Sequence, residues 1–590
     1  MGRKETGVPK KRGGTSRMLA LVVFLSGASL MSLELVGSRV IAPTFGSSIY
    51  TWGSLIGIFM LALSIGYFFG GRLADRKPSY YTLAFVLGLA GVLTLVIPFV
   101  AFEVCLQLAP LKQKWGSFVA CLILFGPPSI LMGMVSPLAI RLAAREIESV
   151  GGVAGLLYAI STFGSIFGTF LTSFFLLELM GMSNLVRAVG VALVFTALIA
   201  LVMALKGKKA NISHAAAALL LIGITTVACL ISAPLSFKSA GAEVLATSDS
   251  PYNTLFVVDS SDGERKLQFN ERSESGFYLS QPHRSSFQYT IGIHMAFALN
   301  KNARNILLVG GGGAVLPIEM LCAYDDVDMQ IDSVEIDPGV IDYSQRYFVN
   351  HAVKVFEESE NPAWNNWATR VRERLHLIEA DGRTYVRTCG NKYDMIIMDA
   401  YLGGRIPFHL CTTEFFADLR NCLADDGVLA MNIISGWRGK TSKVFKSIYR
   451  TVNQHFPNIV LVPSVPFAGF GFTNVSDLHK THEQPQNIIL IATLGDDKKM
   501  TGEQFRGAVK ALGERGFYPY DLYGDIRIQL ASAGTVEDFE KIEKDIIDRM
   551  ASSGGARPDF EPLVPEDTPI LTDEYSPVDI WSGYIMLHAR

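Results

Sequence analysis

Long apolar runs fill the first 235 residues of the chain, whereas later runs are short and separated by charged segments. A helix needs about 20 mostly apolar residues to cross a bilayer. The runs that meet this length are residues 18–42, 50–70, 80–102, 115–136, 153–180, 184–205 and 214–234. We therefore predict a multi-pass α-helical membrane domain of about seven helices at 18–235, preceded by a basic cytoplasmic leader at 1–17.

Small and acidic residues interrupt these apolar runs. Gly164 and Gly168 are one helical turn apart, and this spacing predicts a close approach to another helix. Glu34 and Glu178 are carboxylates within apolar runs, where a buried charge is costly. Each acid has two interpretations, a role in a transport pathway or a polar contact between helices.

Short strands begin near residue 245. Two alternating apolar segments flank Ser261-Asp262-Gly263, a pattern that predicts a β-hairpin. An apolar helix is expected at about 285–299, so residues 245–300 form a small N-terminal β-hairpin subdomain. From 301 to 590, strands alternate with helices, and this alternation predicts a parallel, doubly wound α/β Rossmann-like sheet. The predicted strands are Ile306–Val309, Ile331–Glu335, Leu375–Glu379, Tyr393–Met398, Val428–Ile433 and Ile459–Val462.

Composition narrows the classes of function. Apolar residues make up 49% of the chain and charged residues 18%, an imbalance that comes from the N-terminal part. A net charge of −3 gives no reason to expect a nucleic-acid partner. The seven cysteines form no C-x-x-C pair, and no His/Cys spacing typical of a metal site occurs. We expect reduced thiols and no metal.

A glycine run marks the candidate cofactor site. Gly310 to Gly313 follow the first predicted strand of the sheet, and a helix is expected from Ala314. Glycines let the backbone approach a ligand closely, and the amides at a helix start favour polar groups. Val315 replaces the third glycine of the G-x-G-x-x-G dinucleotide motif. The motif therefore indicates a nucleoside cofactor without fixing its type.

Acidic residues follow three successive predicted strands. They are Glu335, Asp381, which is followed by Gly382, and Asp399. Carboxyl ends of parallel strands share one edge of the sheet, where ligands bind. The alternative for each acid is a helix N-cap or a solvated loop acid. The Asp-Gly pair favours an adenosylmethionine-type cofactor over a dinucleotide.

Several motifs together resemble the polyamine aminopropyltransferase (spermidine synthase) family, specifically bacterial members with an N-terminal membrane domain. They include S-P-Y-N, V-G-G-G-G-A-V-L-P, V-E-I-D, A-D-G, M-D-A-Y and L-T-D-E-Y-S-P-V-D, together with L-S-G-A-S-L-M-S-L-E-L-V-G-S-R near the N-terminus. The resemblance implies a class I methyltransferase-like fold. It implies cofactor binding by Gly310, Gly312, Glu335 (ribose), Asp381 and Gly382 (adenine), Asn253, Gln288 and Tyr289, with Asp399 as the catalytic base or amine-orienting group.

The resemblance also implies an activity. A family member moves an aminopropyl group from decarboxylated S-adenosylmethionine to an amine such as putrescine. This chain departs from the family pattern at Gly313 and Leu402, where typical synthases have aspartates that meet amines, and Arg405 adds a positive charge nearby. An S-adenosylmethionine-dependent methyltransferase-like enzyme is therefore an alternative.

A second alternative is a transporter or sensor that binds a polyamine or nucleoside, because G-G-R-L-A-D-R at 70–76 resembles a loop of major-facilitator transporters. Basic residues fall on alternate connections, which orients the leader toward the cytoplasm. Six spanning helices would leave the C-terminal part in the cytoplasm, and a seventh would place it outside. An intracellular cofactor favours the cytoplasmic face of an inner membrane. The expected partners are a small amine and the bilayer, and a homo-oligomer is compatible with the sequence.

Overall fold

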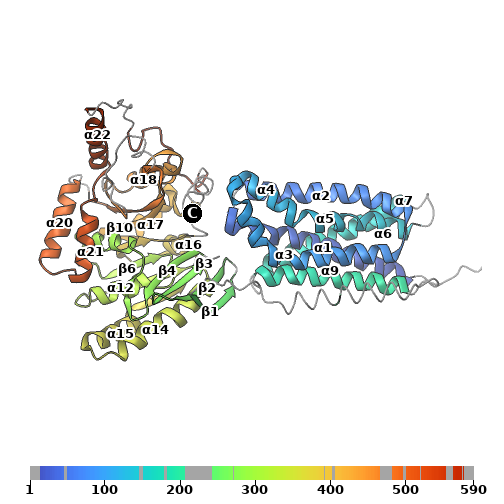
Figure 1. The fold of residues 1–590 in the computed structure, drawn as a ribbon, viewed down its shortest axis with the longest axis horizontal. Coiled ribbons are helices and arrows are strands. Elements are labelled where there is room, and N and C mark those ends of the chain that lie inside the picture. The colour runs from blue at the N-terminus through green and yellow to red at the C-terminus, as the bar shows by residue number, and fades with distance from the viewer. Residues whose placement is uncertain are drawn as a thin grey trace, which may run out of the picture. The chain divides into compact units, whose positions relative to one another are not determined.

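The computed structural model describes residues 13–45, 49–144, 150–177, 182–205, 223, 242–250, 252–269, 272–390, 392–401, 405–464, 481–495, 500–518, 520–552, 562–574, 576 and 578. The chain separates after Phe237 into two compact units, which are taken one at a time. Figure 1 shows the helices of the first unit and the mixed α/β structure of the second.

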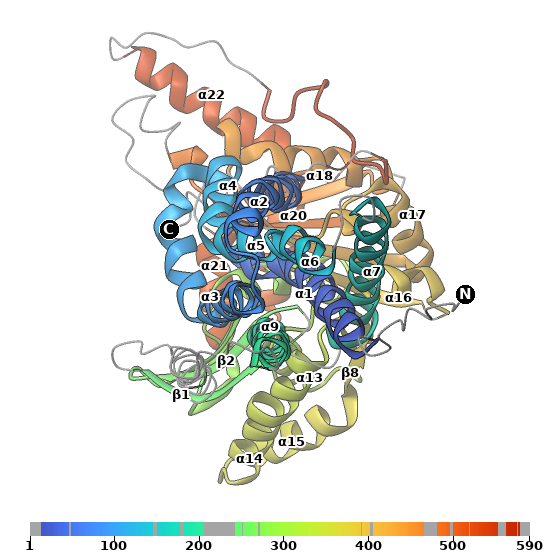
Figure 2. The same ribbon diagram turned by 90° about the vertical axis from the view of Figure 1, so that its right-hand side faces the viewer.

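The first unit is a bundle of helices, seen end-on in Figure 2. Helix α1 packs along α7 and α3 packs along α9. Helix α1 begins at Gly13, so residues 13–17 of the predicted leader are already helical. The helices are α1 (Gly13–Phe45), α2 (Ile49–Arg76), α3 (Tyr80–Leu108), α4 (Lys112–Leu124), α5 (Gly126–Gly133), α6 (Val135–Ala143), α7 (Val150–Leu171), the π-helical η3 (Thr172–Leu176) and α9 (Met182–Leu205).

Five helices of the described chain are long and apolar enough to cross a membrane: Arg17–Ala42, Tyr50–Arg76, Tyr80–Ala101, Gly151–Leu176 and Met182–Leu205. The prediction of a single helix at 115–136 is wrong. The chain there bends by 50° between Lys114–Leu124 and Gly126–Ala143, where Pro127 and Pro128 follow the break and cannot donate backbone hydrogen bonds. Counted as one broken span, this pair makes six. The predicted seventh helix, 214–234, lies outside the described residues apart from Gly223.

Glycines allow the helix backbones of this unit to touch. A Cβ atom on Gly164 would lie 2.1 Å from the Phe24 carbonyl oxygen, and one on Gly168 would lie 2.3 Å from that of Ala28. The predicted close packing is therefore confirmed, with α1 as the partner of α7. Next to it, the Thr172 hydroxyl donates a hydrogen bond to Ser32 Oγ (2.8 Å). Glu34 is half-buried in α1, and Glu178 lies outside the described residues.

The second unit opens with a five-stranded antiparallel sheet, β1 (Ala242–Asp249), β2 (Thr254–Ser260), β3 (Glu264–Phe269), β4 (Arg272–Tyr278) and β5 (Gln281–Ser285). The predicted hairpin is confirmed as β2 and β3, with Gly263 at a φ of +81° in the turn. The helix predicted at 285–299 is shorter, because β5 extends to Ser285. Only α11 (Tyr289–His294) and the 3₁₀ turn η4 (Met295–Ala298) are helical.

The main sheet has seven strands in the order β11-β12-β10-β9-β6-β7-β8. Their bounds are β6 (Asn305–Val309), β7 (Gln330–Glu335), β8 (Leu375–Glu379), β9 (Tyr393–Met398), β10 (Leu423–Ser435), β11 (Asn458–Pro463) and β12 (Gln486–Thr493). The prediction of an all-parallel sheet is wrong. Strand β12 lies between β10 and β11 and is antiparallel to both. It follows β11 in the chain and pairs directly with it, so the chain reverses direction between these two strands.

Helices cover both faces of this sheet. Ile306 and Leu308 of β6 pack toward α12, α14, α15, α20 and α21, whereas Leu307 and Val309 pack toward α16, α17 and α18. Figure 1 shows the two sets of helices around the strands. The helices are α12 (Val315–Ala323), α13 (Pro338–Tyr343), the π-helical η5 (Ser344–Val349), α14 (Asn350–Glu357), α15 (Pro362–Arg374), α16 (Gly382–Thr388), α17 (Thr413–Cys422), α18 (Lys443–Asn453), α20 (Gly502–Glu514), α21 (Tyr520–Leu530) and α22 (Val536–Ser552).

Candidate active site

The glycine loop turns between the end of β6 and the start of α12. Gly310 has a φ of +97°, and a Cβ atom there would lie 2.5 Å from the Asp399 carbonyl oxygen. Gly312 has a φ of +46°, and its Cβ would lie 2.5 Å from Ser275 Oγ. Both positions therefore need glycine for conformation and for space. The loop fits between the end of β9 and strand β4, and it leaves its amides at the edge of the sheet.

The predicted acids follow neighbouring strands. Because β9, β6, β7 and β8 are adjacent in the sheet, Asp399, the glycine loop, Glu335 and Asp381 follow one another along its carboxyl edge. This order places an acid on each side of the glycine loop, as expected for a ligand that crosses several strand ends.

Glu335 is the last residue of β7 and is held by backbone amides. Its Oε1 accepts hydrogen bonds from the amides of Ile336 (2.9 Å) and Asp337 (3.2 Å), and its Oε2 accepts one from Gly312 (3.3 Å). Burial raises the pKa of Glu335 to about 6, although these hydrogen bonds oppose the rise. The carboxylate is thus fixed against the glycine loop and lines the cavity beside it.

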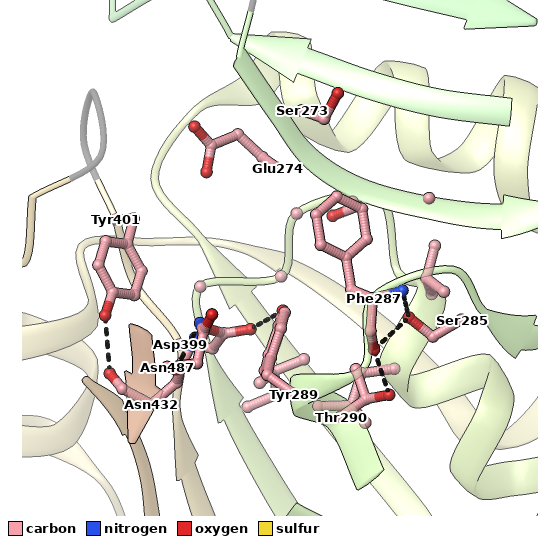
Figure 3. Close-up of a pocket in the computed structure, with 18 of the residues that line it drawn as sticks. Ser273, Glu274, Ser285, Phe287, Tyr289, Thr290, Asp399, Tyr401, Asn432 and Asn487 are labelled. Carbon is pink, nitrogen blue, oxygen red and sulfur yellow. Dashed lines mark hydrogen bonds between the residues drawn. The ribbon is translucent and has the colours of Figure 1, made fainter. Parts of the chain in front are cut away.

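A cavity of about 150 Å³ lies above the glycine loop. Figure 3 shows its labelled residues, which come from β4, β5, α11 and the ends of β9, β10 and β12. Its polar wall is formed by Ser273, Glu274, Ser275, Ser285, Tyr289, Thr290, Glu335, Asp399, Tyr401, Asn432 and Asn487. The cavity therefore lies between the N-terminal sheet and the carboxyl edge of the main sheet.

Asp399 is oriented by two hydrogen-bond donors. The Tyr289 hydroxyl donates to Oδ2 (2.6 Å), and Asn432 Nδ2 donates to Oδ1 (2.8 Å). Burial raises the pKa of Asp399 to about 6, and both hydrogen bonds lower it again. A carboxylate with such a pKa can accept a proton near neutral pH and still be ionised before the reaction.

Asn432 is itself fixed by neighbours. Asn487 Nδ2 donates to Asn432 Oδ1 (3.0 Å), so strand β12 supports the residue that orients Asp399. The Tyr401 hydroxyl donates to the Asn432 carbonyl (2.9 Å) and accepts from the Ile434 amide (2.9 Å). This chain of hydrogen bonds keeps the Asp399 carboxylate in one position.

Asp381 lies after β8 as the N-cap of α16. Its Oδ1 accepts a hydrogen bond from the Thr384 amide (2.8 Å). Asp381 therefore caps a helix, the alternative role that the sequence had left open for it. Its Oδ2 lies 3.6 Å from His409 Nε2. A Cβ atom on Gly382 would lie 2.5 Å from Val309 Cγ1, so a larger residue would not fit. Both residues lie beyond the residues that line the cavity.

Two of the predicted contact residues are placed elsewhere. Asn253 is buried in the turn before β2, where its carbonyl accepts from the Ser250 hydroxyl (2.9 Å), and that hydroxyl also binds Asp337. Gln288 lines a neighbouring cavity, and its carbonyl accepts from Gln529 Nε2 (3.0 Å). Of the pair Gln288 and Tyr289, the structure therefore brings Tyr289 to Asp399.

Sequence reasoning missed most of this polar wall, including Glu274, Ser275, Asn432 and Asn487. Asn432 had a visible signal, because it is the one polar residue in the apolar run Val428–Ile433. Asn487 stands before the apolar run that forms β12. Glu274 and Ser275 lie on β4, a strand without clear alternation, so the sequence offered no comparable sign.

The two departures from the family motifs have different outcomes. At Gly313 the amide donates to Ser275 Oγ (2.9 Å), so β4 occupies the space beside the loop where an aspartate side chain would start. Leu402 lies outside the described residues. Arg405, expected to add a positive charge near the site, is 5% exposed and does not line the cavity. In the described ranges, no group of three or more His, Cys, Asp or Glu residues could hold a metal ion.

The fold and the site define a Rossmann-like α/β domain with a polar cavity at the carboxyl edge of its sheet, where ligands bind in such folds. Residues 287–485 match the model of the spermine/spermidine synthase domain. The polyamine aminopropyltransferase of Vibrio vulnificus is 30% identical over 241 residues, which cover 39% of this chain and 71% of that protein. The chain therefore belongs to the polyamine aminopropyltransferase family, whose members are transferases.

Other relatives differ in how much they share. Polyamine aminopropyltransferase 1 of Ralstonia nicotianae is 23% identical over 491 residues, 79% of this chain and 85% of that protein. The 491 residues are more than the second unit, Lys238–Arg590, contains, so the similarity extends into the helical unit. The chain spans only 52% of the Alkaliphilus oremlandii relative. A probable spermidine synthase structure from Corynebacterium glutamicum gives a TM-score of 0.35 at 18% identity, covering 46% of this chain and 88% of that one.

Proposed function

We propose that this protein moves an aminopropyl group from decarboxylated S-adenosylmethionine to an amine such as putrescine, in the cavity above the glycine loop. The observation that carries the proposal is the Asp399 carboxylate, which Tyr289 and Asn432 orient at the wall of that cavity. The family relationship supports the same class of reaction.

The residues of the sheet edge suit the nucleoside part of this substrate. Gly310 and Gly312 let the loop pack against Ala400 and Ser275, and the loop backbone lines the cavity where a ligand could approach it. Glu335 would accept hydrogen bonds from ribose hydroxyls, and Asp381 would accept one from the adenine amino group. Asp381 can do so with Oδ2, because its capping hydrogen bond uses Oδ1.

The bound substrate supplies a carbon activated by a neighbouring sulfonium, whose sulfur leaves as a neutral thioether. At neutral pH the acceptor is an ammonium ion, which has no lone pair to attack that carbon. Asp399 accepts one proton from this ammonium, and the freed nitrogen lone pair forms the new C–N bond as the C–S bond breaks. Tyr289 and Asn432 keep the carboxylate aimed at the amine, and its negative charge stabilises the cationic substrates.

Replacing Asp399 by Asn tests the assignment, because Asn keeps the shape of the side chain and removes the base. With full-length protein, decarboxylated S-adenosylmethionine and putrescine, we expect the wild type to release 5′-methylthioadenosine. The variant is expected to be slower by roughly 10²–10⁴-fold, the usual contribution of a general base. Equal rates in both proteins would exclude Asp399 as the base.

Methyl transfer is the second candidate, and one observation favours it. Ser275 occupies the space beside Gly313, so the loop offers no carboxylate at that position to an aminopropyl ammonium. Chromatography of the nucleoside product separates the two reactions. Aminopropyl transfer leaves 5′-methylthioadenosine, whereas methyl transfer from intact S-adenosylmethionine leaves S-adenosylhomocysteine.

For location, we propose that the first unit crosses the bacterial inner membrane and that the second unit works in the cytoplasm. The long apolar helices and their exposed aromatic side chains, such as Phe163 (65%) and Phe174 (61%), support contact with lipid. Protease protection of inside-out and right-side-out vesicles tests the orientation. Cleavage of the second unit only in inside-out vesicles is expected, and cleavage only in right-side-out vesicles would contradict it.

A further inference from the structure

A third carboxylate, besides Glu335 and Asp399, lies on the wall of the cavity, away from the strand ends. Glu274 belongs to β4 of the N-terminal sheet, and Figure 3 shows it separated from Asp399 across the site. In the described part of the chain, no hydrogen bond or ion pair engages its carboxylate. A half-buried carboxylate without a partner is a group that a bound cation would stabilise.

Glu274 lines the same cavity as Tyr289 and Tyr401. Burial chiefly raises the pKa of each tyrosine, and the Glu274 charge adds a smaller part of the rise. Burial raises the pKa of Glu274 to about 8, Arg272 opposes the rise, and the Asp399 charge adds to it. The groups that face Glu274 thus include one cation, Arg272, and one acid, Asp399.

Strand β4, which carries Glu274, packs closely against the glycine loop at Gly313. A Cβ atom on Gly313 would lie 3.0 Å from Ser275 Cβ, so a side chain there would crowd β4. The Gly313 amide binds Ser275 Oγ, which holds this part of β4 in place. Glu274 precedes Ser275, so the strand that closes over the loop also carries a carboxylate into the cavity.

We propose that Glu274 binds the primary ammonium group of a substrate, in place of the aspartate that is absent at position 313. This inference rests on the proposed aminopropyl transfer. The ammonium group can belong to the aminopropyl chain of the donor or to the acceptor amine. Either way, the bound ammonium favours the ionised form of Glu274, and the negative charge comes from the N-terminal sheet instead of the glycine loop.

Three variants test this role in the full-length protein. Glu274→Gln removes the charge at constant size, and Glu274→Asp keeps the charge on a shorter side chain. The matched control is Glu243→Gln, at an exposed glutamate of β1. The measurements are the KM for putrescine at saturating donor, and the Kd values of decarboxylated S-adenosylmethionine and of 5′-methylthioadenosine, which lacks the ammonium group.

Loss of a charge-assisted hydrogen bond predicts an effect of about tenfold or more for Glu274→Gln. If Glu274 holds the acceptor, the KM for putrescine rises and the donor Kd stays unchanged. If it holds the donor, the Kd of decarboxylated S-adenosylmethionine rises while that of 5′-methylthioadenosine does not. In both cases Glu274→Asp is expected to recover part of the loss, and Glu243→Gln to match the wild type.

The outcomes separate this inference from the proposed function. If the wild type is active and Glu274→Gln has the same KM and Kd values, the role of Glu274 is overturned and the proposed function is not. A parallel loss of affinity for 5′-methylthioadenosine would also overturn it, because that result indicates a damaged cavity. A wild type that forms no aminopropyl product from any amine would overturn the proposed function, and the inference with it.

Discussion

Tyr289 and Asp399 form a hydrogen-bonded pair whose chemistry depends on pH. The Tyr289 hydrogen bond lowers the pKa of Asp399, while burial holds it near 6. Only the ionised carboxylate can accept a proton from the amine, so the rate should fall as the pH drops below about 6. Removing the hydroxyl should raise the pKa of Asp399 further and move this fall to higher pH.

We therefore expect Tyr289→Phe to shift the acidic limb of the kcat/KM profile upward in pH. At pH 7 the variant should be slower by roughly tenfold, as for other lost hydrogen bonds to a charge. The measurement is kcat/KM between pH 5 and 9 for both proteins. A lower rate with an unmoved acidic limb would show that Tyr289 does not act through Asp399.

Among the individual site residues, sequence reasoning found those at the ends of strands. Glu335, Asp381 and Asp399 are acids at or just after the ends of predicted strands, a position that the strand pattern alone makes visible. Glu274 and Asn487 reach the same cavity from β4 and β12. Their positions depend on tertiary packing, which leaves no regular spacing in the sequence. The same packing explains why Gln288 turns to a different cavity.

Among the elements, the contact between α1 and α7 is specified by glycines. A valine at Gly168 would place its Cβ 2.3 Å from the Ala28 carbonyl, against backbone that cannot rotate away. We expect Gly168→Val to destabilise the helical unit by about 1–3 kcal/mol or more, as for other overpacked interiors. Thermal unfolding in detergent measures this change.

The matched control is Gly155→Val on the same helix, because a Cβ there meets nothing within 4 Å. This variant should unfold near the wild-type temperature. Equal unfolding temperatures for Gly168→Val and Gly155→Val would contradict the close packing of α1 against α7.

Helix α22 is anchored by a buried ion pair. Glu543 is 1% exposed and accepts from Arg438 Nε (3.1 Å), and His482 Nδ1 lies 3.5 Å away. Burial alone would raise the pKa of Glu543, but hydrogen bonds from His482 and Arg438 outweigh it and lower the pKa to about 2. The stabilisation is therefore complete above about pH 4.5 and is lost as the pH falls toward 2.

Glu543→Ala leaves Arg438 buried without this partner, so we expect a loss of about 3–5 kcal/mol at pH 7. The exposed Glu537, on the same helix, supplies the control Glu537→Ala, which should cost little. Denaturant unfolding at pH 7 and pH 3 gives the comparison. If the two variants were equally stable at pH 7, the anchor would carry no stability.

The elements were predictable where their pattern was regular. Six strands of the main sheet were placed from apolar runs bounded by polar segments, and all six exist. Strand β12 was missed, although Ile488–Ala492 is an apolar run, because it follows a polar segment and breaks the alternation of strand and helix. Its antiparallel direction is a property of tertiary pairing and could not be inferred from composition.

For the whole molecule, composition already separated a helical part from an α/β part, and the structure divides at Phe237. The similarity to the Ralstonia nicotianae relative continues into the helical unit, so these two proteins are similar over parts of both units. On the proposed membrane topology, the helical unit would hold the second unit at the cytoplasmic surface.

The proposed aminopropyl transfer requires the cavity to bind decarboxylated S-adenosylmethionine in preference to the intact form. Calorimetric titration of the wild type with both compounds measures this directly, with Asp381→Ser as a control that keeps a helix cap while removing the adenine acceptor. We expect the decarboxylated compound to bind at least about tenfold more tightly, and the variant to bind both more weakly. Tighter binding of intact S-adenosylmethionine, or binding of neither, would contradict the account.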